Sequence, residues 1–298
     1  MAQYDVAAAP EARPGLPAVR TIGIADLKDA LRKGLDDFWA MPTHAIFLCV
    51  IYPILGLLVA RAVFGYAIEP LLYPLAAGFA LIGPLAAIGL YELSRRREMG
   101  LPTGWEHTFD VVHSPSFRGI VALGLLLLVI FGTWVAVANA LYVSFFGYHE
   151  PATLLEFLKR VVTTPEGYRL NVLGNLVGFL FAVVVLVISA VSFPLLLDRH
   201  ATATQAMLTS VRSFARNPVT MMVWGLIVAV ALLLGSLPLF IGLAFVLPVL
   251  GHATWHLYRK VVEPPLQPRP EYIAPPRTPR SAADFPVSLI PGARDEQR

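Results

Sequence analysis

The sequence is poor in the residues and motifs on which redox, metal and phosphate chemistry are usually built. It has one cysteine, Cys49, so an intramolecular disulfide is impossible and a cysteine-based metal site is disfavoured. A glycine-rich phosphate loop, a G-x-S-x-G nucleophile elbow and an H-E-x-x-H zinc motif are all missing from its 298 residues. These absences leave no motif that indicates a reaction.

Charge is also scarce, whereas apolar residues are abundant. Charged residues make up 14% of the chain and hydrophobic residues 56%, against about 45–50% apolar in an ordinary globular domain. Such a composition predicts insertion into a membrane. The net charge of +3 comes without a basic patch interleaved with aromatic residues, so the sequence argues against nucleic acid as a partner.

A short unit recurs three times along the chain. Each unit is an amphipathic stretch, then a proline (Pro42, Pro115 or Pro218), then an apolar run long enough to cross a bilayer and return. The pattern predicts an all-α fold, a six-span transmembrane helical bundle built from three amphipathic-helix-plus-hairpin units. The ends of the first and third units also match, because Pro84 and Pro248 are followed by an aromatic residue and an arginine at the same spacing.

The hydrophobic runs define the predicted domain organisation. A disordered tail is expected over 1–22, a six-helix membrane domain over 23–260 and a proline-rich disordered cytoplasmic tail over 261–298. Six spans are predicted: 43–62, 71–93, 119–146, 171–197, 219–235 and 237–258. A short interfacial helix is expected in the largest external loop, at 147–170.

Basic residues set the predicted orientation. Arg95, Arg96 and Arg97 end the second span and place that end in the cytoplasm. The same bias places both termini in the cytoplasm, as expected for a multi-pass protein of a bacterial inner membrane. The amphipathic stretches then lie at the cytoplasmic side, either on the membrane surface with the apolar face down or packed on the protein itself. The sequence leaves these two placements open.

Five ionisable residues are predicted to lie near the cytoplasmic mouth of the bundle. His252 and His256 are four residues apart and share a helix face, and Glu92 occupies the position after Pro84 that His256 occupies after Pro248. This predicted polar cluster comprises His44, Glu92, Asp198, His252 and His256. Inward-facing ionisable groups in a membrane protein are a functional hypothesis, whereas separate interfacial anchors are the alternative.

Two segments resemble a bacterial family of integral membrane proteins known only as a domain of unknown function. They are FPLLLDRHATATQAMLTSVRSFARNPVTMMVWGLIVAV and LPLFIGLAFVLPVLGHATWHLYRKVV, and the resemblance covers about residues 22 to 262. Members are often labelled cytochrome c oxidase subunit I. Three histidines at membrane depth are too few for the haem and copper ligands of that enzyme. The resemblance implies no substrate and no catalytic residue.

Three hypotheses for the function follow. The first is a non-enzymatic protein that organises the envelope or handles lipid, the second a small-molecule or ion transporter, and the third a haem or metal redox accessory. No catalytic residue, cofactor or metal is predicted. The expected partners are membrane lipids, with a homo-oligomer or other membrane proteins as further possibilities.

Overall fold

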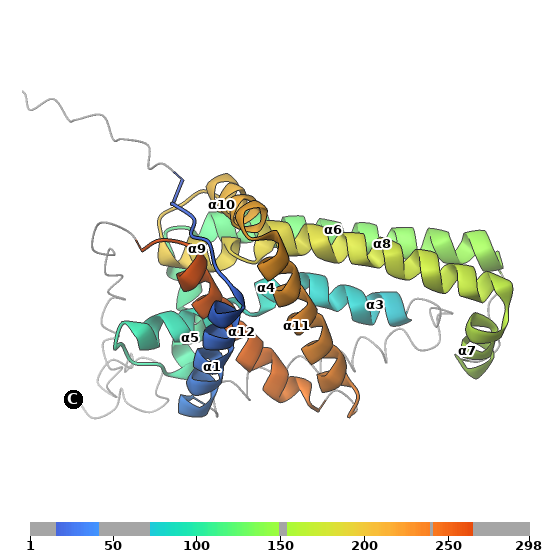
Figure 1. Ribbon diagram of the computed structural model, residues 1–298, viewed down its shortest axis with the longest axis horizontal. Coiled ribbons are helices and arrows are strands. Elements are labelled where there is room, and N and C mark those ends of the chain that lie inside the picture. Colours follow the sequence, from blue (N-terminus) through green and yellow to red (C-terminus); the bar gives the residue numbers. More distant parts are fainter. Residues whose placement is uncertain (1–15, 42–71, 149–153, 239–240, 265–298) are drawn as a thin grey trace, which may run out of the picture. The chain divides into compact units, whose positions relative to one another are not determined.

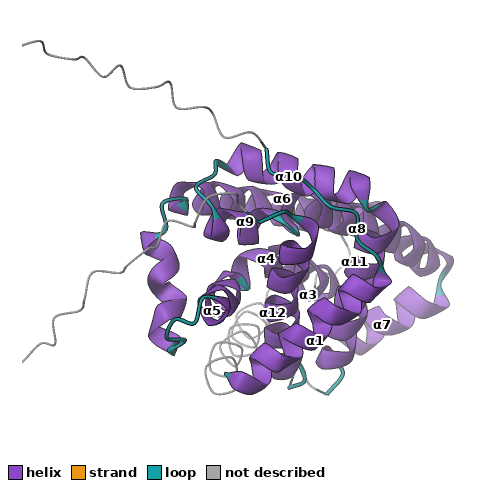
Figure 2. Ribbon diagram, turned by 60° about the vertical axis from the view of Figure 1, so that its left-hand side comes forward, coloured by secondary structure: helices purple, strands orange, loops and turns teal. Residues whose placement is uncertain are grey.

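The computed structural model describes residues 16–41, 72–148, 154–238 and 241–264. Within these ranges the chain forms helices and no strand, which confirms the predicted all-α class (Figure 2). The predicted first span at 43–62 lies outside the described residues, as do His44, Cys49 and most of both predicted tails.

Four helical stretches in the described part are long and apolar enough to cross a membrane. They are 73–98, 117–146, 165–198 and 218–236, and they coincide with the predicted spans two to five. The two longest contain α6 (Phe117–Phe146) and α8 (Pro165–Ser189), which lie side by side, with α7 (Leu154–Thr163) joined to their far end (Figure 1). Large apolar side chains face outwards along both helices, as expected where lipid replaces water.

A proline lies near the end of each hairpin, and two of the three stand beside a break in the helix, because a proline removes one helical hydrogen bond and its ring clashes with the preceding turn. Pro84 lies where the second span is divided into α3 (Leu72–Phe79), the 3₁₀ turn η2 (Ala80–Ile82), α4 (Gly83–Ala86) and α5 (Ile88–Glu98). Pro194 lies in α9 (Ser192–Asp198), just after the break that ends α8. Pro248 lies inside α12 (Leu243–Val261), which continues through it.

The chain after each of these prolines is buried in protein. We call α5, α9 and residues 250–261 of α12 the exit segments. They pack against one another, and most of their side chains are inaccessible, the aromatic rings of Tyr91, Phe193 and Trp255 among them. The exit segments therefore form a compact core, whereas the long spans expose much of their surface.

Each predicted amphipathic stretch packs on one exit segment. The first is α1 (Ile24–Ala40), which packs along α12. The second is the 3₁₀ helix η3 (Trp105–His113), which packs on α5, and the third is α10 (Ala203–Arg216), which packs on α9 and α8. For α1, the structure favours the placement on the protein, since Leu27, Ala30 and Phe38 of its apolar face are buried.

The contact between α1 and α12 is close because both helices present small residues. A Cβ added at Gly34 would lie 2.6 Å from the backbone nitrogen of Ala253 and 2.7 Å from the carbonyl oxygen of Val249. Glycine therefore lets the two backbones approach each other.

The segment that precedes α1 is one end of the described chain, and it binds the other end, where α12 finishes. Arg20 donates its backbone N–H to the carbonyl of Val261 at 2.7 Å, and Val19 pairs with Val262 in an isolated β-bridge. The amide of Asn217 binds the same segment, since its Oδ1 accepts from the backbone of Ile22 at 2.8 Å. The segment thus lies between the start of α11 and the end of α12.

The predicted sixth span has no counterpart among the candidate spans of the described residues. α12 has 19 residues, and its second half is covered by α1, α5 and α9 rather than exposed to lipid. The six-span count therefore stays a prediction.

Candidate functional site

Ionisable side chains gather among the exit segments and the helices that cover them. A buried carboxylate or guanidinium is stable only when it is paired and hydrogen-bonded. The described residues form three such groups, each of which joins two or three elements, and a separate apolar groove lies beside one of them.

The first group, the Asp37 cluster, comprises Asp37 of α1, Ser94 and Arg97 of α5, and His252 and His256 of α12. Asp37 is almost wholly buried. Its Oδ2 accepts hydrogen bonds from the hydroxyl of Ser94 at 2.6 Å and from Nε2 of His256 at 2.9 Å, and Arg97 pairs with its Oδ1. One carboxylate therefore joins three helices.

The hydrogen bonds also fix the tautomer of His252. The single hydroxyl proton of Ser94 is given to Asp37, so the 2.8 Å contact between Ser94 Oγ and His252 Nδ1 requires the ring nitrogen to donate. Nε2 of this fully buried ring has no hydrogen-bond partner among the described residues, and it is left as the unprotonated nitrogen.

Electrostatics favour the ionised form of Asp37. Burial raises its pKa, but the hydrogen bonds from His256 and Ser94 and the positive charge of His256 outweigh burial. The pKa of Asp37 therefore lies below the usual range for aspartate.

The second group, the Glu92 cluster, comprises Glu92, Arg95 and Arg96 of α5 with His107 and Asp110 of η3. Arg95 binds both oxygens of Glu92, at 2.7 and 2.8 Å. Arg96 donates to Asp110 at 3.3 Å and to the carbonyl of Pro102 at 2.7 Å. His107 Nδ1 lies 2.7 Å from the same Asp110 oxygen. These bonds hold η3 on α5.

The third group, the Asp198 cluster, joins α9, α12 and the end of α5. Tyr258 donates its hydroxyl to Asp198 at 2.6 Å, and Arg259 lies 3.4 Å from the same oxygen. Arg259 also pairs with Glu98 at 3.0 Å, and Trp255 donates to Glu98 at 3.1 Å. The cluster therefore connects all three exit segments.

The predicted site residues do not converge on one point. His252 and His256 share the Asp37 cluster, whereas Glu92 and Asp198 belong to the other two clusters, and no hydrogen bond or ion pair between described residues joins Glu92 to His256. His44 lies outside the described residues. The sequence reasoning missed Asp37, although a spacing signal existed: Asp37 and Asp110 each stand five residues before the proline of their unit.

The described residues contain no group of three histidine, cysteine or acidic side chains arranged to hold a metal ion. In the Asp37 cluster, the guanidinium of Arg97 already occupies one oxygen of the carboxylate. The clusters have the composition of structural ion pairs that fix how helices dock.

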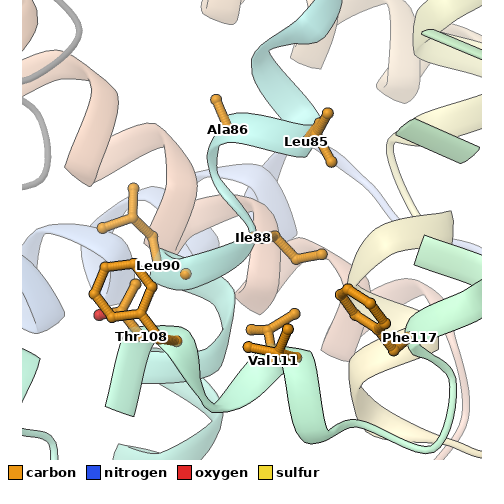
Figure 3. Close-up of a pocket in the computed structure, with 10 residues that line it drawn as sticks. Leu85, Ala86, Ile88, Leu90, Thr108, Val111 and Phe117 are labelled. Atoms are coloured by element: carbon orange, nitrogen blue, oxygen red, sulfur yellow. The ribbon is translucent and has the colours of Figure 1, made fainter. Parts of the chain in front are cut away.

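An apolar groove of about 310 Å³ opens between α4, α5 and η3, next to the Glu92 cluster. Leu85, Ile88, Thr108, Val111 and Phe117 surround it (Figure 3). Val112 also lines the groove and is itself exposed, as is Phe109. The volume of the groove is at the lower end of the range for small-molecule pockets, and the only side-chain hydroxyl in its lining is that of Thr108.

Comparison with known proteins gives one match. No curated protein and no solved structure matches this sequence. The sequence model of a family described as a predicted integral membrane protein (DUF2189) matches residues 72–198, which run from α3 to α9 and include the groove and the Glu92 cluster. Over these residues the chain is similar to that family of predicted integral membrane proteins, in agreement with the resemblance seen in its sequence.

Proposed function

We propose that this integral membrane protein is a non-enzymatic lipid-handling protein that holds one acyl chain in the groove between α5 and η3. The groove itself carries the proposal, because its walls are nearly all apolar and it opens beside exposed Phe109 and Val112. A lipid tail is the apolar ligand that a membrane supplies in excess.

The surroundings of the groove support a position at the headgroup boundary. Arg95, Arg96 and Arg97 follow the groove residues of α5, and such a basic end marks the cytoplasmic interface. The third amphipathic helix, α10, also exposes apolar residues, Leu208 and Val211. Apolar side chains exposed at this depth contact lipid rather than water.

The proposed architecture has six spans in three units, with both termini in the cytoplasm of a bacterial cell. The packing of α1 on α12, of η3 on α5 and of α10 on α9 supports it, because each amphipathic segment covers the exit segment of the unit before it. This holds for η3 and α10, whereas α1 of the first unit covers the exit segment of the third. The units would then form a closed ring.

Photocrosslinking tests the acyl-chain site. The purified protein is reconstituted with a phospholipid that carries a diazirine in its acyl chain, irradiated and mapped by mass spectrometry. We expect adducts concentrated at 85–90 and 108–117. The Val112→Trp variant adds bulk to the groove and should lower this labelling about tenfold, the effect of roughly 1.4 kcal/mol of lost affinity.

Val129→Trp is the matched control, because Val129 is exposed on α6 and does not line the groove. It should leave the adducts at 85–90 and 108–117 unchanged. Labelling spread evenly over all exposed span surfaces, with no loss in Val112→Trp, would mean only a lipid annulus and would refute the proposal.

The transporter hypothesis finds less support. His252 and His256 are engaged in the cluster that docks α1, and Arg97 pairs with the carboxylate between them. A permanently charged guanidinium on that carboxylate favours a structural role over proton uptake. Flux of protons into proteoliposomes that disappears in Asp37→Asn would reverse this preference.

A further inference from the structure

Helix α7 has two apolar faces, and among the described residues only one of them is covered. Phe157 is buried against Tyr142 and Phe146 of α6. Leu155, Leu158 and Val162 are exposed by 77%, 49% and 75%. Their spacing of three and four residues puts them on one stripe along the helix. The exposed stripe is therefore an ordered surface of α7 that none of the described residues covers.

The corner between α7 and α8 is tightly built. A Cβ at Gly167 would lie 2.3 Å from the carbonyl oxygen of Val161, so the first turn of α8 touches the backbone of α7. Thr164 caps α8 by accepting from the backbone N–H of Gly167 at 3.0 Å, and its hydroxyl donates to the carbonyl of Arg160 at 2.7 Å. Arg160 also lies over the ring of Phe146, 5.0 Å from its centroid. These contacts hold α7 at a fixed angle to α8.

The stripe continues the lipid-facing surface of the two longest spans. α7 joins the ends of the candidate spans 117–146 and 165–198 that lie farthest from Arg95–Arg97 (Figure 1). Tyr148 and Tyr168, which flank it in sequence, are exposed aromatics of the kind that gather at membrane interfaces. Lys159 is also exposed and stands four residues after Leu155 and three before Val162, so it lies at the edge of the stripe.

We propose that α7 is an interfacial anchor whose Leu155–Leu158–Val162 stripe inserts into the outer leaflet at the boundary between headgroups and acyl chains. Because the corner is rigid, the depth of the stripe sets the depth of α8 in the bilayer. The occupant is phospholipid, since a stripe of three residues is far smaller than the roughly 800 Å² that each partner buries in a stable protein complex. The inference does not depend on the groove.

Depth-dependent quenching tests the anchor in the full chain. Cys49 is changed to alanine, a single cysteine is placed at 158, and the site is labelled with an environment-sensitive fluorophore in nanodiscs. Lipids with a nitroxide at carbon 5 of the acyl chain should quench this label at least about twofold more than lipids with a nitroxide at carbon 12, because interfacial helices bury their apolar face about 5–10 Å deep.

Glu156→Cys provides the matched control, because Glu156 is exposed on the same helix but outside the stripe. Its label should be quenched by aqueous iodide and only weakly by either nitroxide. Equal quenching at 156 and 158 would overturn the proposal. A label at 158 that is shielded from both iodide and nitroxides would also overturn it, because the cover would then be protein. Val162→Cys repeats the measurement on the same stripe should the Leu158 variant fold poorly.

Discussion

At the scale of single residues, Asp37 contributes more to the docking of α1 than the two histidines that the sequence predicts, His252 and His256. It is the only acidic member of its cluster, and Ser94, Arg97 and His256 all address its two oxygens. Ion pairs of this kind often contribute little net stability, yet the loss of one partner leaves the other buried and uncompensated.

Asp37→Asn should therefore destabilise the docked state of α1. We expect a loss of about 2–4 kcal/mol, less than for a fully buried pair because the side chain of Arg97 is 41% exposed. The measurement is the midpoint of thermal unfolding in detergent. Asp29→Asn is the control on the same helix, since Asp29 is partly solvated in its pairs with Lys33 and Lys260 and should cost less than about 1 kcal/mol. Equal effects of the two changes would contradict this role.

Because the pKa of Asp37 is lowered, the stability that Asp37 gives to the docked state of α1 should depend on pH, and the direction of this dependence follows from the shift. A carboxyl group whose pKa is lower in the folded state stabilises that state above its unfolded pKa, about 3.9, and loses the contribution as the pH falls towards its folded pKa. The contribution of Asp37 should hold from pH 7 down to about pH 4 and then decrease. The part due to Asp37 is the difference between the wild type and Asp37→Asn in an acid titration of the unfolding midpoint. A constant difference down to pH 2 would be inconsistent with it.

At the scale of elements, the contact of α1 with α12 depends on the absence of a side chain at Gly34. Gly34→Ala would push Cβ into the backbone around Ala253, and overpacking of this kind costs about 1–3 kcal/mol. Trypsin should then cleave faster at the exposed Arg32 and Lys33 of α1. Gly23→Ala meets nothing within 4 Å and should leave the cleavage rate unchanged.

The pattern of apolar residues predicted a helix well where the pattern lies entirely within that helix. The spans that contain α6, α8 and α11 follow from apolar runs, and α1 and α10 follow from helical spacing. Apolar runs do not tell lipid from protein as a neighbour, so they predict the sixth span but not the burial of the second half of α12 under other helices. The break after α8 follows from Pro194, but the burial of α9 depends on tertiary packing.

The candidate site could be predicted only in part, because its residues are far apart in the sequence. His252 and His256 were found because they share a helix face, which is a local relation. Asp37 lies 219 residues from His256, and Ser94 lies 158 residues from His252. Only tertiary packing brings these residues together, and the common position of Asp37 and Asp110 before their prolines was the one local signal.

At the scale of the whole molecule, the proposed topology is tested with a reporter at two sites, one on each proposed side of the membrane. A reporter that is active only in the cytoplasm should work when it is fused after Arg259 and stay silent when it is inserted within 150–168. The excess of arginine around the exit segments underlies this expectation. The reverse pattern would contradict the orientation, and activity at both sites would contradict the spans between them.

The docking of α1 on α12 also has a consequence for the order of events during synthesis. α1 leaves the ribosome before α12, since His256 follows its partner Asp37 by 219 residues. At about 5–20 residues per second, α1 waits roughly 10–40 s for α12. Throughout that time its apolar face lacks the cover that α12 gives it in the folded protein. We expect this face to lie on the leaflet surface meanwhile, and the two placements that the sequence allows for this helix would then be successive stages of one protein's biogenesis, first on the membrane and afterwards on α12.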